Sequence, residues 1–205
     1  MRPLDLPLEL DANPDKQEIL RAWIDEGMLS LSLSHAFPES YRSCTDVWPM
    51  LLSDVFHHVA DALVIETGVD RSVVQQDLQR AFEEVIRSDR GTRAGKLRQH
   101  EHLPLLPDPD VTDENGVEII RIILTPGAIR VIVRVGMWIK SGEEEVWGNL
   151  LYDLCSMIAS SLDKQAADSI RDRFAKKIIG YVEHPSTTYS GNFYGHEAKE
   201  DHSAT

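Results

Sequence analysis

The sequence predicts an α+β fold built from two ββαα repeats with pseudo-two-fold symmetry, which form one four-stranded antiparallel sheet covered on one face by four helices. Three observations support this prediction. The pattern V-W-x-x-L-L-x-D occurs twice, beginning at Val47 and at Val146. Two stretches with the signals of a β-hairpin precede each copy, and a second amphipathic helix follows each copy. The chain is therefore interpreted as two tandem copies of one domain.

A β-hairpin is predicted at the start of each repeat. Residues 118–127 combine β-branched isoleucines with a Pro-Gly turn signal, and residues 129–135 then continue as a second strand. Residues 18–27 align with the first of these stretches 100 positions earlier, which favours strand for a segment that alone could form a short helix. The alignment pairs Glu18 with Glu118, Arg21 with Arg121, and Gly27 with Gly127. The arginines and glycines are expected to be structural anchors of the repeat, with the glycines in the hairpin turns.

An amphipathic helix begins at each tryptophan pattern. The apolar stripe from Trp48 to Leu63 and the stripe from Trp147 to Leu162 both follow helical spacing. The two tryptophans are expected to anchor the core, because large aromatic side chains at an apolar helix start are usually buried. A second helix is predicted after each of these. The first repeat carries about seven additional residues between its helices, around residues 64–70.

These elements divide the chain into four parts. The first ββαα repeat is placed at residues 1–90, a polar linker at 91–112, the second repeat at 113–182, and a disordered tail at 183–205. A two-stranded hairpin alone is marginally stable in water. The two hairpins are therefore expected to pair into one sheet, although two separate domains on the linker are the alternative.

The composition is that of an acidic globular protein. The net charge of −13 argues against binding to nucleic acid or to an anionic membrane, since both require a cationic face. Five basic residues between 87 and 98 are interpreted as a solvated linker. No secretory signal and no membrane-spanning run is visible, and the two cysteines form no disulfide framework, so a cytoplasmic location is expected. Phosphate-binding, zinc-protease and EF-hand motifs are absent from the sequence, and no cofactor is predicted.

One group of side chains has metal-ligand spacing. Asp54, His57, His58 and Asp61 lie on the first amphipathic helix, where the Asp54–His58 and His57–Asp61 pairs are four residues apart. The second repeat keeps only the first aspartate, as Asp153. The simpler interpretation is a solvated helix face, because adjacent histidines on a helix diverge by about 100°.

The repeated aspartates have a structural interpretation as well. Asp54 and Asp153 are expected to form ion pairs with the repeated arginines, Arg21 and Arg121, or else to be solvated at the surface. If the two carboxylates met, they could serve acid–base chemistry.

The two cysteines are the candidate nucleophiles. Cys44 precedes a helix N-terminus, where a thiolate is stabilised, and Cys155 lies beside an apolar stripe. No second cysteine and no nucleophile-elbow motif supports a catalytic role for either residue.

The hairpin and first-helix patterns resemble a small bacterial domain family of unknown function, present here as two tandem copies. The pattern is E-x-L-R-A-W, then glycine, then L-x-L-x-L, then W-x-x-L-L-x-D. The residues that carry it are Glu18, Leu20, Arg21, Ala22, Trp23, Gly27, Leu29, Leu31, Leu33, Trp48, Leu51, Leu52 and Asp54. The second copy matches less completely, since it lacks Ala-Trp after Arg121. The resemblance implies a domain organisation and no activity.

The sequence favours a non-enzymatic protein-interaction module, either an adaptor or a regulator, that docks a protein partner through an outer strand or a helix face. A homodimer is a further expectation. The alternative is an enzyme that binds a metal or a small molecule at the Asp54/His57/His58/Asp61 face or between the repeats.

Overall fold

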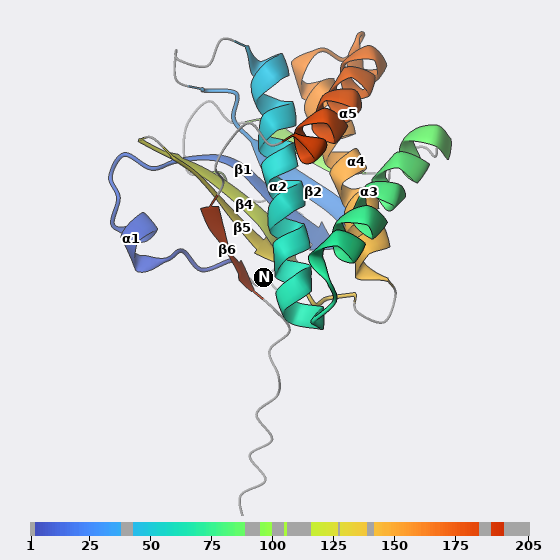
Figure 1. The fold of residues 1–205 in the computed structure, drawn as a ribbon. Helices are drawn as coiled ribbons and strands as arrows, with labels where there is room; N and C mark the ends of the chain where they lie inside the picture. Colours follow the sequence, from blue (N-terminus) through green and yellow to red (C-terminus); the bar gives the residue numbers. More distant parts are fainter. Residues whose placement is uncertain are drawn as a thin grey trace, which may run out of the picture.

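The structure is a computed structural model that describes residues 3–37, 43–88, 95–99, 105, 116–126, 128–138, 142–184 and 190–194. It consists of a β-sheet with four long helices on one face and a short N-terminal helix, α1 (Leu8–Asp11), on the other (Figure 1). The predicted α+β fold class is confirmed. Along the described segments, none of the helices combines the length and the apolarity that crossing a membrane requires.

The same series of elements occurs twice in the chain. The first series is β1 (Gln17–Asp25), β2 (Met28–Leu33), α2 (Cys44–Thr67), α3 (Arg71–Ser88) and β3 (Gly95–Gln99). The second series is β4 (Val117–Thr125), β5 (Ala128–Arg134), α4 (Glu143–Leu162), α5 (Ala167–Glu183) and β6 (Ser190–Tyr194). Each repeat is therefore a ββααβ unit.

The six strands form one sheet in the order β3-β2-β1-β4-β5-β6. Its four central strands are antiparallel, as predicted, while β3 and β6 add a parallel strand at each outer edge. A parallel neighbour requires a long crossover, and the two helices of each repeat supply it.

The two outer strands correct the predicted boundaries. β3 lies inside the interval 91–112 that was expected to be only a linker, and β6 lies inside the interval 183–205 that was expected to be disordered. Both were missed because Gly-Lys-Leu-Arg-Gln and Ser-Gly-Asn-Phe-Tyr lack the apolar alternation by which a half-buried strand is recognised.

The two repeats join where β1 pairs with β4, which we call the seam. Its register places Arg21 directly opposite Arg121, so the pseudo-two-fold axis passes between residues that correspond in the two repeats. Apolar pairs flank them on the helical side, with Leu20 opposite Ile122 and Ala22 opposite Ile120. A shift by one residue would move these apolar side chains to the other face of the sheet, which fixes the register.

The turn between β1 and β2 consists of Glu26 and Gly27, both with positive φ, at 49° and 79°. Two consecutive residues with positive φ are typical of the tight hairpin turn that suits twisted strands, and glycine adopts this conformation without strain. Gly27 thus occupies the predicted turn, whereas Gly127 lies outside the described residues.

The main core lies between the sheet and the four long helices. Trp48 and Trp147, each near the start of its helix, have no exposed area and pack in this core. The side chains that the central strands contribute include Leu20, Leu29, Leu31, Leu33, Ile120, Ile122, Val131 and Val133. A smaller cluster of Leu4, Leu10, Ile123 and Ile132 lies apart from it and joins the N-terminal segment to β4 and β5.

The helices α3 and α4 approach closely at a glycine. A Cβ atom built on Gly148 would lie 2.6 Å from the Cβ of Ala81 and 2.8 Å from the backbone nitrogen of Phe82. The close packing of the first repeat's second helix against the second repeat's first helix therefore depends on the missing side chain.

We expect Gly148→Ala to lower the free energy of unfolding by about 1–3 kcal/mol, because the added methyl group must push α3 away from α4. The matched control is Gly180→Ala in α5, where a Cβ atom meets no other atom within 4 Å. That variant should gain about 0.5–1 kcal/mol from helix propensity. Urea unfolding of both variants measures the difference, and equal effects would contradict the close-packing argument.

Candidate functional site

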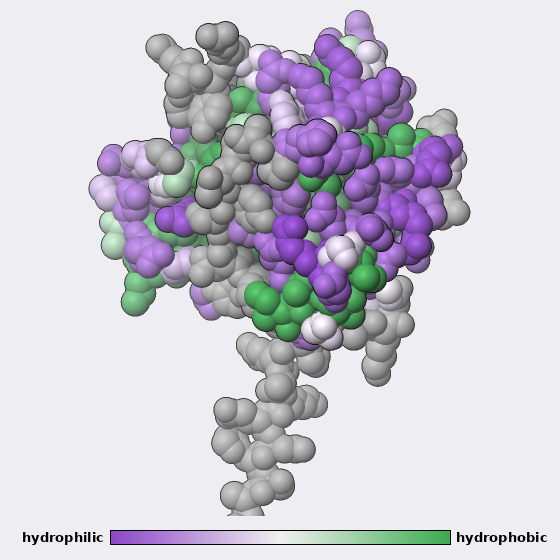
Figure 2. Space-filling model, viewed as in Figure 1, coloured by the Kyte–Doolittle hydropathy of each residue, from purple (hydrophilic) through white to green (hydrophobic). Residues whose placement is uncertain are grey.

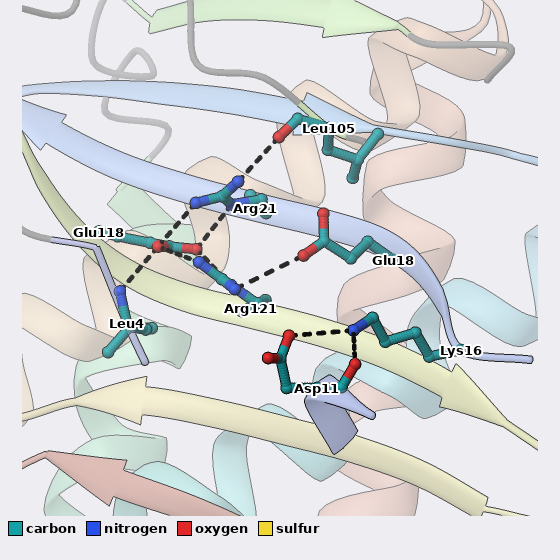
Figure 3. A network of polar contacts seen from close by, with 8 residues as sticks. All are labelled: Leu4, Asp11, Lys16, Glu18, Arg21, Leu105, Glu118 and Arg121. Carbon is teal, nitrogen blue, oxygen red and sulfur yellow. Dashed lines mark hydrogen bonds and ion pairs between the residues drawn. The ribbon is translucent and has the colours of Figure 1, made fainter. Parts of the chain in front are cut away.

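The outer face of the seam, away from the four long helices, holds a buried cluster of charged residues (Figure 3). We call Glu18, Arg21, Glu118 and Arg121 the polar cluster. Arg21 and Arg121 would repel each other as cross-strand neighbours. The carboxylate of Glu118, which has no exposed area, lies between them and accepts two hydrogen bonds from each guanidinium.

The geometry of these hydrogen bonds is that of strong, bidentate ion pairs. Arg21 donates from Nε and Nη2 at 2.8 and 3.0 Å, and Arg121 donates from the same two atoms at 2.8 and 2.7 Å. The arrangement breaks the pseudo-symmetry, because Glu18 approaches Arg121 only at 3.6 Å and its Oε2 is buried without a hydrogen-bond partner. Glu118 thus carries most of the neutralisation in the cluster.

Burial and hydrogen bonding act in opposite directions on Glu118. Burial alone would raise the pKa of its carboxyl group, but the hydrogen bonds from Arg121 and Arg21 outweigh burial and hold that pKa below its ordinary value. Burial would likewise lower the pKa of the Arg121 guanidinium, and its bonds to Glu118 raise that pKa instead. Glu118 and Arg121 are therefore both charged at neutral pH.

The segments that precede the two hairpins, which we call the lead-ins, cover this cluster. Each lead-in reaches across the seam to the other repeat. The backbone N–H of Leu4, from the first repeat, donates to Glu118 Oε2 at 2.8 Å. The backbone carbonyl of Leu105, which precedes the second repeat, accepts from Arg21 Nη1 at 3.0 Å. Arg134 of β5 also donates to the carbonyl of Pro3 at 2.8 Å. Each repeat's lead-in therefore contacts the strands of the other repeat.

The repeated aspartates do not pair with the repeated arginines, so that prediction is wrong. Asp54 and Asp153 lie on α2 and α4, on the helical side of the sheet, whereas Arg21 and Arg121 point to the outer face and bind Glu118. The sequence places a glutamate three positions before each arginine. Spacing alone does not show whether an arginine pairs with that glutamate or with an aspartate on a helix. Asp54 and Asp153 are both nearly fully buried, with 2% and 5% of their area exposed.

The four residues with metal-ligand spacing are also placed differently from the expectation. Asp54 and His57 are buried, and Asp61 forms an ion pair with Arg71 at 2.6 Å. Burial lowers the pKa of His57, and the nearby charge of Arg71 lowers it further. Within the described residues, no group of three His, Cys, Asp or Glu side chains is arranged to hold a metal ion. The structure does not assemble the Asp54/His57/His58/Asp61 site.

His35, whose backbone carbonyl accepts a hydrogen bond from the Cys44 thiol, uses both of its ring nitrogens in other hydrogen bonds. His35 Nδ1 accepts a hydrogen bond from the indole N–H of Trp48 at 3.0 Å, and its Nε2 lies 2.9 Å from Ser161 Oγ. Burial lowers the pKa of His35, which keeps the ring neutral with its proton on Nε2. Both ring nitrogens are engaged, so His35 does not activate a thiol. Cys155 is fully buried, and that burial raises the pKa of its thiol.

The second repeat satisfies its tryptophan in another way. The indole N–H of Trp147 lies 3.4 Å from Glu143 Oε1, which also accepts from the backbone N–H of Gly136 at 2.7 Å. Burial raises the pKa of the Glu143 carboxyl group. The two repeats therefore share the buried tryptophan and differ in the polar group that receives its N–H.

Comparison with known proteins agrees with the repeat. A family model described as a domain of unknown function (DUF5076) matches the chain twice, over residues 3–89 and 104–187. The chain belongs to this family. The resemblance inferred from the tryptophan patterns is thereby confirmed, including the two tandem copies. No curated protein and no solved structure matches the chain.

The DUF5076 matches agree with the crossed lead-ins. Leu4 and Leu105 are each the second residue of a match, and each is buried. The matches end before β3 and β6 begin, so the outer strands of this DUF5076 pair lie beyond the matched regions. The unit that the family model matches therefore comprises the lead-in, the hairpin and the two helices.

A surface feature of this DUF5076 pair was not predicted from the sequence. Ile65, Val69 and Val73 are exposed over 65%, 40% and 45% of their areas, at the end of α2 and the start of α3. We call these three residues the α2–α3 corner. Figure 2 shows hydrophobic side chains gathered at this lower end of α2, on a face that is otherwise mostly hydrophilic. The length difference of the first repeat around residues 64–70 was the only signal for it.

We expect Glu118→Gln to lower the free energy of unfolding by about 3 kcal/mol at pH 7, because two buried arginines lose their shared carboxylate. The pseudo-symmetric control, Glu18→Gln, removes a single 3.6 Å ion-pair contact in place of four hydrogen bonds, and it should therefore lower stability clearly less than Glu118→Gln does. Urea unfolding measures both. Equal losses of unfolding free energy would contradict the conclusion that Glu118 contributes more to stability than Glu18.

The lowered pKa of Glu118 also predicts how stability depends on pH. A carboxyl group with a lowered pKa in the folded state contributes stability that is present above its ordinary pKa of 4.5 and is lost as pH falls through the folded value. The stability gap between the wild type and Glu118→Gln should therefore be largest at neutral pH and narrow below about pH 4.5. Urea midpoints measured from pH 7 to pH 3 test this, and a gap that widens in acid would contradict it.

Proposed function

We propose that this protein is a non-enzymatic, cytoplasmic protein-interaction module that docks a partner at the α2–α3 corner. The exposed apolar residues there support the proposal. Among the described residues, the large hydrophobic side chains that are exposed are Leu8, Met28, Ile65, Val69 and Val73. Three of these five belong to the corner, and exposed apolar side chains that gather at one place are typical of interaction sites.

The second repeat supplies an internal comparison for the corner. Helix α4 has 20 residues against 24 in α2, and Asp163, Lys164 and Gln165 follow it directly. No exposed large hydrophobic residue lies in the described part of the second repeat. The ββααβ unit therefore folds without such a corner, which favours a functional origin for the apolar residues of the first repeat.

The described geometry gives less support to an enzyme. Asp54 and His57 are buried, and the side chains with metal-ligand spacing do not converge. Cys44 donates to the carbonyl of His35 at 4.0 Å, while both nitrogens of the His35 ring are already engaged. The most charged cluster lies at the seam, where covering segments bury it.

The interaction function can be tested by site-specific photo-crosslinking in cells. A benzophenone amino acid replaces Ile65 in one variant and Leu8, which is 88% exposed on α1, in the matched control. We expect a discrete adduct from position 65 that is lost when Val69→Ser is added, because the partner then loses apolar contact. Adducts of the same size from both positions, or no adduct from position 65, would contradict the proposal.

A further inference from the structure

We propose that the α2–α3 corner binds a cationic amphipathic helix of a partner protein, an inference that rests on the interaction function proposed above. It follows from the shape of the apolar corner and from the charges around it.

The three apolar residues lie close together in the chain, where one helix ends and the next begins. Ile65 lies in the last turn of α2, which ends where Gly68 adopts a positive φ of 71°. Val69 follows directly in the connection, and Val73 lies in the first turn of α3. The two helix ends thus present a short apolar ridge, made of Ile65, Val69 and Val73. A partner helix can cover it with apolar side chains spaced three and four residues apart along one face.

The chain segment that carries these three residues is acidic. Residues 61–80 contain four carboxylates and two arginines. Both arginines already form ion pairs, Arg71 with Asp61 at 2.6 Å and Arg80 with Asp77 at 2.7 Å. Two of the carboxylates, Glu66 and Asp70, directly follow Ile65 and Val69 in the chain.

Asp70 is one of the carboxylates beside the apolar residues, and local hydrogen bonds favour its charged form. Hydrogen bonds from the Ser72 hydroxyl and backbone N–H groups lower the pKa of Asp70, which keeps its carboxylate ionised. Glu66 and Asp70 therefore add a local negative potential to a chain whose net charge is −13. Such a potential attracts a partner with lysine or arginine beside its apolar residues.

The same charges disfavour other occupants. A second copy placed on the corner by two-fold symmetry would bring Glu66 and Asp70 against their own counterparts. An anionic membrane surface would be repelled by the same carboxylates. A cationic amphipathic helix satisfies both the apolar and the charged features.

The test uses the full chain and two designed peptides in fluorescence anisotropy. Both peptides have leucines at helical spacing, and they carry either lysine or glutamate at all other positions. We expect the lysine peptide to bind and the glutamate peptide not to bind. The double variant Ile65→Ser/Val69→Ser should weaken binding of the lysine peptide by about tenfold or more, because the exposed apolar contacts are lost.

Controls separate this specific contact from general attraction to an acidic protein. Leu8→Ser, which changes an exposed leucine on α1, should leave the affinity unchanged. Glu66→Lys should weaken binding at low ionic strength and less so at high ionic strength, where charges are screened. Thermal melts of all variants check that the fold is retained, as expected for changes at exposed positions.

Three results would overturn the inference. One is equal binding of the lysine peptide to the wild type and to Ile65→Ser/Val69→Ser. A second is a wild-type dimer in sedimentation that this double variant converts to monomer, which would make a second copy the occupant. The third is a specific crosslink at position 65 without binding of the lysine peptide. In that third case the proposed interaction function stands, and only the cationic class of partner is wrong. Absence of any crosslink from position 65 would instead contradict the interaction function itself.

Discussion

The structure depends on the bridging of two like charges at the seam. Strand pairing at β1–β4 places Arg21 against Arg121, and the Glu118 carboxylate makes that register tolerable. Two-fold symmetry brings corresponding residues together at the axis, so a charged residue there always meets its own kind. One carboxylate can occupy the centre between the arginines, and this limits how closely the repeats can resemble each other. Glu118 takes that place, and Glu18 is left with a longer contact.

The two lead-ins also make the repeats depend on each other, because each lead-in covers strands of the other repeat on the outer face of the sheet. Leu4 and Leu10 pack on Ile123 and Ile132 of the other repeat, and the Leu4 N–H completes the bonding of Glu118. Leu105 makes the reciprocal contact with Arg21. Neither repeat therefore buries its polar face by itself. The two repeats form one cooperative unit, in which the first repeat's cover and the second repeat's strands stabilise each other.

Much of the fold could be predicted because duplication supplied a comparison within one chain. Residues 118–124 identified residues 18–24 as strand, and the paired tryptophan patterns located both core helices. The outer strands could not be predicted, since their sequences carry no apolar alternation. The partners of Arg21 and Arg121 were assigned wrongly, because a repeat pattern shows which residues correspond and not which face of the sheet they occupy. The α2–α3 corner could be found only in the folded structure, because Ile65 and Val69 resemble core residues in the sequence.

The covalent link between the repeats determines how many times one molecule displays each surface feature. A symmetric homodimer of a single repeat would display every surface feature twice and could bridge two partners. In the tandem chain the seam forms within one molecule at high effective concentration, so the repeats can diverge without losing their pairing. The α2–α3 corner exists in the first repeat alone among the described residues. The chain therefore offers this surface once, and a partner docked there would be held one to one, without being crosslinked into larger assemblies.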